Sequence, residues 1–101
     1  MTDSGVRVQD DGALWVMSGE IDAAVQARHE DELVRYATSA TRPIRIDLTD
    51  VTFMDSGGLR LLYHAATAGN PGPRLVGTPQ RVRDLLELSG VADLFELESG
   101  A

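Results

Sequence analysis

The chain has 101 residues, of which 43% are apolar and 25% charged, a composition typical of one globular domain that covers residues 1–101. Its net charge of −7 argues against binding to nucleic acid or to an anionic membrane surface and favours a protein partner with a basic face. The sequence has no apolar run long enough for membrane insertion, no signal-peptide pattern and no cysteine. We therefore expect a cytoplasmic protein without disulfides or thiolate metal sites.

Two short strands are predicted at the start of the chain. Residues Val6–Val8 alternate in polarity, Asp10–Gly12 is a turn of the kind that closes hairpins, and Leu14–Ser18 follows as the second strand. Both faces of the second strand are apolar, which predicts a central position in the sheet. Trp15 is expected to pack in the core, because aromatic side chains chiefly supply buried area.

A long helix is predicted from about Ala23 to Ala40, after a turn over Gly19–Asp22 that supplies Asp22 as the N-cap. His29 falls on its apolar stripe, and we expect a partly buried, neutral ring there, with a pH sensor as the alternative. The stripe consists of Val25, Leu33 and Ala37, and the residues expected on a solvated face are Glu30, Asp31, Glu32 and Arg35.

The centre of the chain reads as a strand, a polar turn and a second helix. Ile44–Thr49 alternates between apolar and polar residues, and apolar residues recur at helical spacing from Leu59 onwards. Between them, Asp55 and Ser56 are preferred N-cap types, so the helix should begin there and leave Ser56 exposed among unpaired backbone N–H groups. The pair Gly57–Gly58 is costly in a first helical turn, which indicates either a close approach to another group or an unusual φ/ψ.

The last third of the chain completes an alternation of strands and helices. Residues 68–73 predict an exposed connection, Arg74–Gly77 a short strand, and Thr78–Pro79 the start of a third helix with Thr at the N-cap. That helix should end at Ser89–Gly90, and a last short strand should lie within Val91–Leu97. The order predicts an α/β fold with a mostly parallel sheet. The third helix is expected to bury Val82, Leu85, Leu86 and Leu88.

Three motifs resemble one known family. They are Phe53–Leu59 preceded by Ile46–Thr49, the turn Ser18–Asp22, and Asp84–Val91 followed by Leu94–Phe95. Together they resemble the signature of STAS domains and, more narrowly, of bacterial anti-sigma factor antagonists. The resemblance covers nearly the whole chain. It implies a STAS fold with an N-terminal hairpin, a mostly parallel sheet and about three helices. We expect the terminal helix that most relatives carry to be lacking here, which leaves an open sheet edge, a contact in a homodimer or a shortened variant as alternatives.

The resemblance also implies a function. In that family the unphosphorylated protein binds an anti-sigma factor that is also a serine kinase, and this releases the sigma factor. The position of the phosphorylated serine is matched by Ser56, and Gly57 stands where a second serine is common. A serine phosphatase resets the switch, and ATP and magnesium belong to the kinase, so no cofactor or metal is expected in this chain. The expected partner-binding residues are Glu20, Asp22, Asp55, Ser56, Gly57 and Gly58, at one end of the sheet.

Parts of the sequence also match two other functions. Asp55–Gly58 also matches the nucleophile segment of trypsin-like proteases, but His64 lies about 12 Å along the same predicted helix from Ser56, and no second segment supplies a catalytic His and Asp. We therefore expect no enzyme and no catalytic residue. The second alternative is a STAS scaffold in a signalling particle, or an accessory subunit of a lipid-transport system, without a phosphorylation switch.

Overall fold

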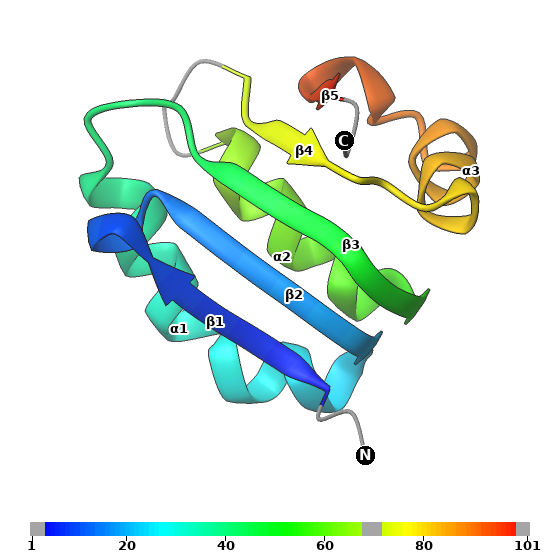
Figure 1. The fold of residues 1–101 in the computed structure, drawn as a ribbon, viewed down its shortest axis with the longest axis horizontal. Helices are drawn as coiled ribbons and strands as arrows, with labels where there is room; N and C mark the ends of the chain where they lie inside the picture. Colours follow the sequence, from blue (N-terminus) through cyan, green and yellow to red (C-terminus); the bar gives the residue numbers. More distant parts are fainter. Residues whose placement is uncertain (1–3, 68–71, 99–101) are drawn as a thin grey trace.

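The computed structural model describes residues 4–67 and 72–98. Five strands form one sheet in the order β1-β2-β3-β4-β5 (Figure 1). Strand β1 (Gly5–Gln9) pairs antiparallel with β2 (Leu14–Ile21), and β2 pairs parallel with β3 (Arg45–Met54). The short strands β4 (Arg74–Val76) and β5 (Glu96–Glu98) extend the parallel part. The predicted α/β class, with a hairpin leading into a mostly parallel sheet, is confirmed.

Three helices connect the parallel strands: α1 (Ala23–Ser39), α2 (Ser56–Thr67) and α3 (Gln80–Leu88). The crossovers through α1 and α2 each lead to the next strand on the same side, so right-handed connections place these two helices against one face of the sheet. Figure 1 shows α1 and α2 behind the sheet, and these two helices also pack against each other. No helix in the described ranges is long and apolar enough to span a bilayer.

Two short 3-10 turns, η1 (Asp10–Gly12) and η2 (Ala92–Leu94), complete the described elements. The turn η1 closes the hairpin as predicted. Most of the predicted connection over residues 68–73 lies outside the described residues, since only Gly72 and Pro73 are placed. Strand β5 is the last described element, so the described chain has no fourth α-helix.

The core lies between the sheet and the helices. Trp15 is fully buried, and its indole N–H donates a hydrogen bond of 2.9 Å to the carbonyl oxygen of Gly12, so the predicted packing role is confirmed. The predicted buried stripe of α1 is also confirmed. His29 is half-buried beside it, and burial lowers the pKa of its ring, with Arg28 adding to the effect and Glu32 opposing it. The neutral imidazole is therefore the favoured form at neutral pH. The stripe residues are Val25, Leu33 and Ala37.

Both central strands are longer than the sequence predicts. The expected ends were Ser18 and Thr49, where the alternation of apolar residues stops, but β2 continues to Ile21 and β3 to Met54. Strand β3 carries extra residues at two register shifts opposite β2. Each such bulge inserts one residue, so the side chains that follow it switch to the opposite face of the sheet. A search for strict apolar–polar alternation therefore does not recognise the strand beyond the bulge. Gly19, expected in a turn, lies inside β2 with a φ of +74°.

Two predictions for α3 are wrong. The N-cap is Pro79, and the Thr78 side chain makes no capping hydrogen bond; its hydroxyl is buried without a partner in the described chain. Leu88 was expected in the core, but it is 88% exposed. It lies two residues beyond the buried Leu86, which is about 200° around the helix axis and so on the opposite face. Val82 is buried as predicted.

Candidate functional site

The candidate site lies where β2 and β3 end next to each other. Ile21 of β2 pairs with Met54 of β3, and the N–H of Asp55 donates to the carbonyl oxygen of Ile21 at 3.4 Å. The next residues begin α1 and α2, so the N-termini of two helices lie together at this end of the sheet. The structure therefore brings the predicted partner-binding residues together, as the parallel arrangement of strands requires. Those residues are Glu20, Asp22, Asp55, Ser56, Gly57 and Gly58.

An aspartate caps each of the two helices. Asp22 Oδ1 accepts hydrogen bonds from the backbone N–H groups of Ala24 and Val25, both at 3.1 Å, which confirms the predicted cap of α1. Asp55 Oδ1 accepts from the N–H groups of Gly57 and Gly58 at 2.8 and 3.4 Å. Asp55, and not Ser56, is thus the N-cap residue, and α2 begins at Ser56.

Ser56 is the first residue of α2, and it is exposed. Within the described ranges its hydroxyl has no hydrogen-bond partner, so the oxygen is open to a reagent from outside the protein. We expected Ser56 to lie among unpaired backbone N–H groups, and this is wrong for the N–H groups of the three residues that follow it, because each of them has an acceptor. The N–H groups of Gly57 and Gly58 are occupied by Asp55, and that of Leu59 donates to the Asp55 carbonyl oxygen at 3.0 Å.

The two glycines of the turn are buried and do not have positive φ, which excludes an unusual φ/ψ as their reason. A Cβ on Gly57 would lie 2.9 Å from the N and Cα atoms of Ala23. A Cβ on Gly58 would lie 2.6 Å from Met54 Cγ and closer still to the carbonyl oxygen of Ile21. The glycines thus allow the start of α2 to approach the end of β2 and the start of α1. A contact of either glycine with a partner stays a prediction.

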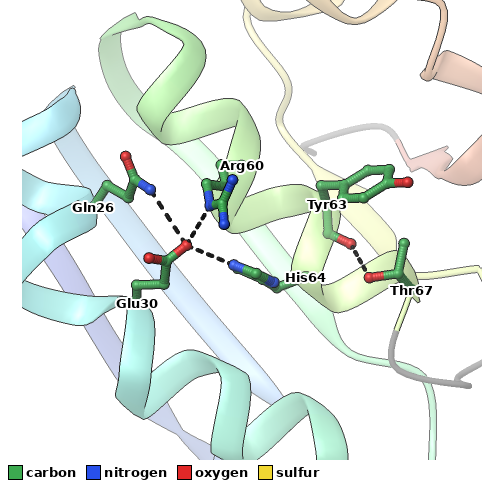
Figure 2. A network of polar contacts seen from close by, with 6 residues as sticks. All are labelled: Gln26, Glu30, Arg60, Tyr63, His64 and Thr67. Carbon is green, nitrogen blue, oxygen red and sulfur yellow. Dashed lines mark hydrogen bonds and ion pairs between the residues drawn. The ribbon is translucent and has the colours of Figure 1, made fainter.

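A polar network joins α1 to α2 beside this turn (Figure 2). Glu30 Oε2 accepts from Arg60 Nε at 2.6 Å and from Gln26 Nε2 at 3.3 Å, and lies 2.7 Å from His64 Nε2. The hydrogen bonds from His64, Arg60 and Gln26, in that order, lower the pKa of Glu30 to about 2. The prediction that Glu30 belongs to a solvated face is therefore wrong, because its carboxylate is turned toward α2.

Sequence reasoning also missed one exposed apolar residue at the site. Phe53 pairs with Glu20 across β3 and β2, and 42% of its surface is exposed. Exposed aromatic rings are frequent anchors at protein–protein interfaces. The bulged part of β3 turns this ring outward, and a period-two pattern gives no signal for that. The described residues contain no group of three His, Cys, Asp or Glu side chains arranged to hold a metal ion.

Comparisons with known proteins agree with the fold and the motifs. A family model described as "Mlab, STAS domain" matches residues 4–97. The anti-sigma-B factor antagonist of Staphylococcus aureus (strain NCTC 8325 / PS 47) is 30% identical over 87 residues, which cover 83% of this chain and 81% of that protein. The antagonist of Staphylococcus epidermidis is 28% identical with the same coverage.

Solved structures show the same architecture. The anti-sigma factor antagonist SpoIIAA in its unphosphorylated form superposes with a TM-score of 0.63 at 14% identity, covering 92% of this chain and 84% of that one. A Shewanella loihica PV-4 protein with a SpoIIAA-like fold gives a TM-score of 0.61 at 10% identity, with coverages of 98% and 88%. At these identities the likeness concerns the fold alone. With the family match over residues 4–97, the chain belongs to the STAS domain family.

Proposed function

We propose that this protein is an anti-sigma factor antagonist whose unphosphorylated form binds an anti-sigma factor with serine kinase activity and thereby releases a sigma factor. The observation that carries the proposal is the exposed, unbonded hydroxyl of Ser56 at the first residue of α2. It lies in the motif that resembles the antagonist signature, and relatives at 28–30% identity are named anti-sigma-B factor antagonists.

Phosphorylation of Ser56 would reverse this binding by charge. A phosphoserine carries about −1.5 to −2 charges at pH 7, and it would be added beside Asp55 and Asp22, in a chain whose net charge is already −7. Like charges brought together at an interface cost several kcal/mol, and each 1.4 kcal/mol is tenfold in affinity. The fold should tolerate the phosphate because Ser56 is exposed. The kinase supplies ATP and magnesium, and a serine phosphatase resets the cytoplasmic switch.

Titration calorimetry tests this proposal, with an anti-sigma factor kinase from the same organism as the probe. The unmodified protein and Ser56→Ala should bind with similar affinity, and Ser56→Ala should remain bound when ATP is added. Ser56→Asp and the phosphorylated protein should bind ten-fold to several thousand-fold more weakly, with melting temperatures close to that of the unmodified protein. Equal affinities of Ser56→Asp and Ser56→Ala would contradict the electrostatic switch.

One observation favours a second function. The matching family model is described as "Mlab, STAS domain", which is not the description of an anti-sigma factor antagonist. A STAS scaffold or an accessory subunit, such as one of a lipid-transport system, would use the same end of the sheet for docking without any modification of Ser56. Binding of a partner that is indifferent to Ser56→Asp would favour this second function.

A further inference from the structure

Arg60 lies one helical turn after Ser56 on the same face of α2. Residues four apart on a helix are neighbours, with Cβ atoms about 5–6 Å apart. Helical side chains lean toward the N-terminus, so a long side chain covers the turn that precedes it. The guanidinium of Arg60 is therefore within reach of a group attached to the Ser56 oxygen. The Arg60 side chain is 61% exposed, so its guanidinium is accessible to such a group.

The Arg60 side chain is already held in place by α1. Its Nε donates to Glu30 Oε2 at 2.6 Å, and Glu30 is in turn held by Gln26 and His64 (Figure 2). Gln26 lies directly against the motif, since a Cβ on Gly57 would be 3.0 Å from its Oε1. Only Nε of the guanidinium is engaged in the described chain. The four N–H donors of the two terminal nitrogens remain, in a planar fork that suits phosphate oxygens.

The backbone at the start of α2 is poorly suited to bind the phosphate without help. The N–H groups of Gly57 and Gly58 already donate to Asp55 Oδ1, and the N–H of Leu59 donates to the Asp55 carbonyl oxygen. The carboxylate of Asp55 would also repel a phosphate attached to the next residue. A phosphate at this position therefore needs donors from a side chain, and Arg60 is the cation that the helix places next to it.

We propose that Arg60 binds the phosphoserine formed at Ser56 within the same chain, and that Glu30 positions the Arg60 guanidinium for this contact. The inference rests on the proposed function for the modification of Ser56 in the cell. The modification and the contact change the predicted partner-binding surface around Ser56 in two ways. The phosphate adds negative charge, and the guanidinium of Arg60, which is exposed in the unmodified protein, is no longer available to a partner. Phosphorylation thus removes a cation from the surface in the same step that adds an anion.

The test uses the full chain with phosphoserine installed at position 56 by an expanded genetic code, so that no kinase is needed. Phosphorus NMR over a pH series gives the second pKa of the phosphate, which is about 6 for free phosphoserine. We expect this pKa to be about 0.5 to 1 lower in the parent protein than in Arg60→Gln, because a neighbouring cation favours the dianion. The matched control is Arg35→Gln, an exposed arginine of α1, which should leave the pKa unchanged. Equal values for the parent protein and Arg60→Gln would overturn the proposal.

A second measurement needs no substitution at Arg60. In nitrogen-15-labelled protein, the side-chain N–H signals of Arg60 should shift when Ser56 is replaced by phosphoserine, while those of Arg35 stay in place. Unchanged Arg60 signals would also overturn the proposal. A negative result in either test would not contradict the proposed function, because that function depends on the kinase phosphorylating Ser56 and not on Arg60. A kinase that ignores Ser56 would instead refute the proposed function without affecting either spectrum.

Discussion

Gly58→Ala tests whether the second glycine of the motif is required by packing inside the domain. The new Cβ would lie 2.6 Å from Met54 Cγ and 2.9 Å from Ile21 Cγ2, where ordinary contact begins at 3.4 Å, a shortfall of 0.8 and 0.5 Å. The nearest obstacle is the backbone oxygen of Ile21, which cannot rotate away. Overpacking of this kind costs about 1–3 kcal/mol, and the better helix propensity of alanine returns roughly 0.5–1 kcal/mol.

The difference between these ranges is about 0–2.5 kcal/mol, and because the nearest obstacle is a backbone atom we expect its upper part: Gly58→Ala should lower the free energy of unfolding by about 1–2.5 kcal/mol, or the melting temperature by roughly 4–20 °C for a domain of this size. Thermal unfolding followed by circular dichroism measures this. The control is Gly5→Ala, whose Cβ would meet only His29 Nε2 among the described residues, at an ordinary 3.6 Å, so its stability should stay within about 0.5 kcal/mol of the parent. A Gly58→Ala protein as stable as the parent would refute the packing argument and return Gly58 to a role in partner contact alone.

Three further predictions concern the caps and the titrating groups. Asp22→Ala should lose about 1 kcal/mol of stability in urea melts, because two N–H groups of α1 lose their acceptor, whereas Asp22→Asn should lose much less. The pKa of Glu30 is lowered from 4.5 to about 2, so its stabilising effect is complete above pH 4.5 and lost as the pH falls toward 2; Glu30→Gln should not show this loss. The pKa of His29 is also lowered, so protonation favours the unfolded chain, and stability should fall as the pH drops below 6.5. A His29→Gln protein with the same slope of unfolding free energy against pH between 5 and 7 would contradict the last prediction.

Local patterns predicted most of the fold. Helical spacing of apolar residues gave α1 and its buried stripe, and the Asp22 cap fixed its start to the residue. The pattern failed where the backbone departs from regular geometry. The bulges of β3 depend on its pairing with β2, so the sequence pattern of β3 alone does not predict them. The cap of α3 was missed because Thr78 is a preferred capping type, but Pro79 takes the N-cap position.

The candidate site was also predicted only in part, because local residue types predict its caps but not its contacts between distant residues. The aspartate caps and the exposed Ser56 follow from residue types at a strand-to-helix turn, and the sequence order of parallel strands placed them at one end of the sheet. The contact of Glu30 with Arg60 joins residues 30 positions apart, and it exists only because α1 packs against α2. The role of Gly58 is likewise decided by the neighbouring strand β2, which local propensity does not describe.

The most direct test of the central claim is peptide mass spectrometry of the protein isolated from its native cell, before and after stress. Digestion after arginine releases the peptide 46–60, which contains Ser56. We predict a phosphate on Ser56 of this peptide under at least one of these conditions. A main phosphorylation site at Ser39 or Ser89, or an unmodified Ser56 under every condition, would contradict it.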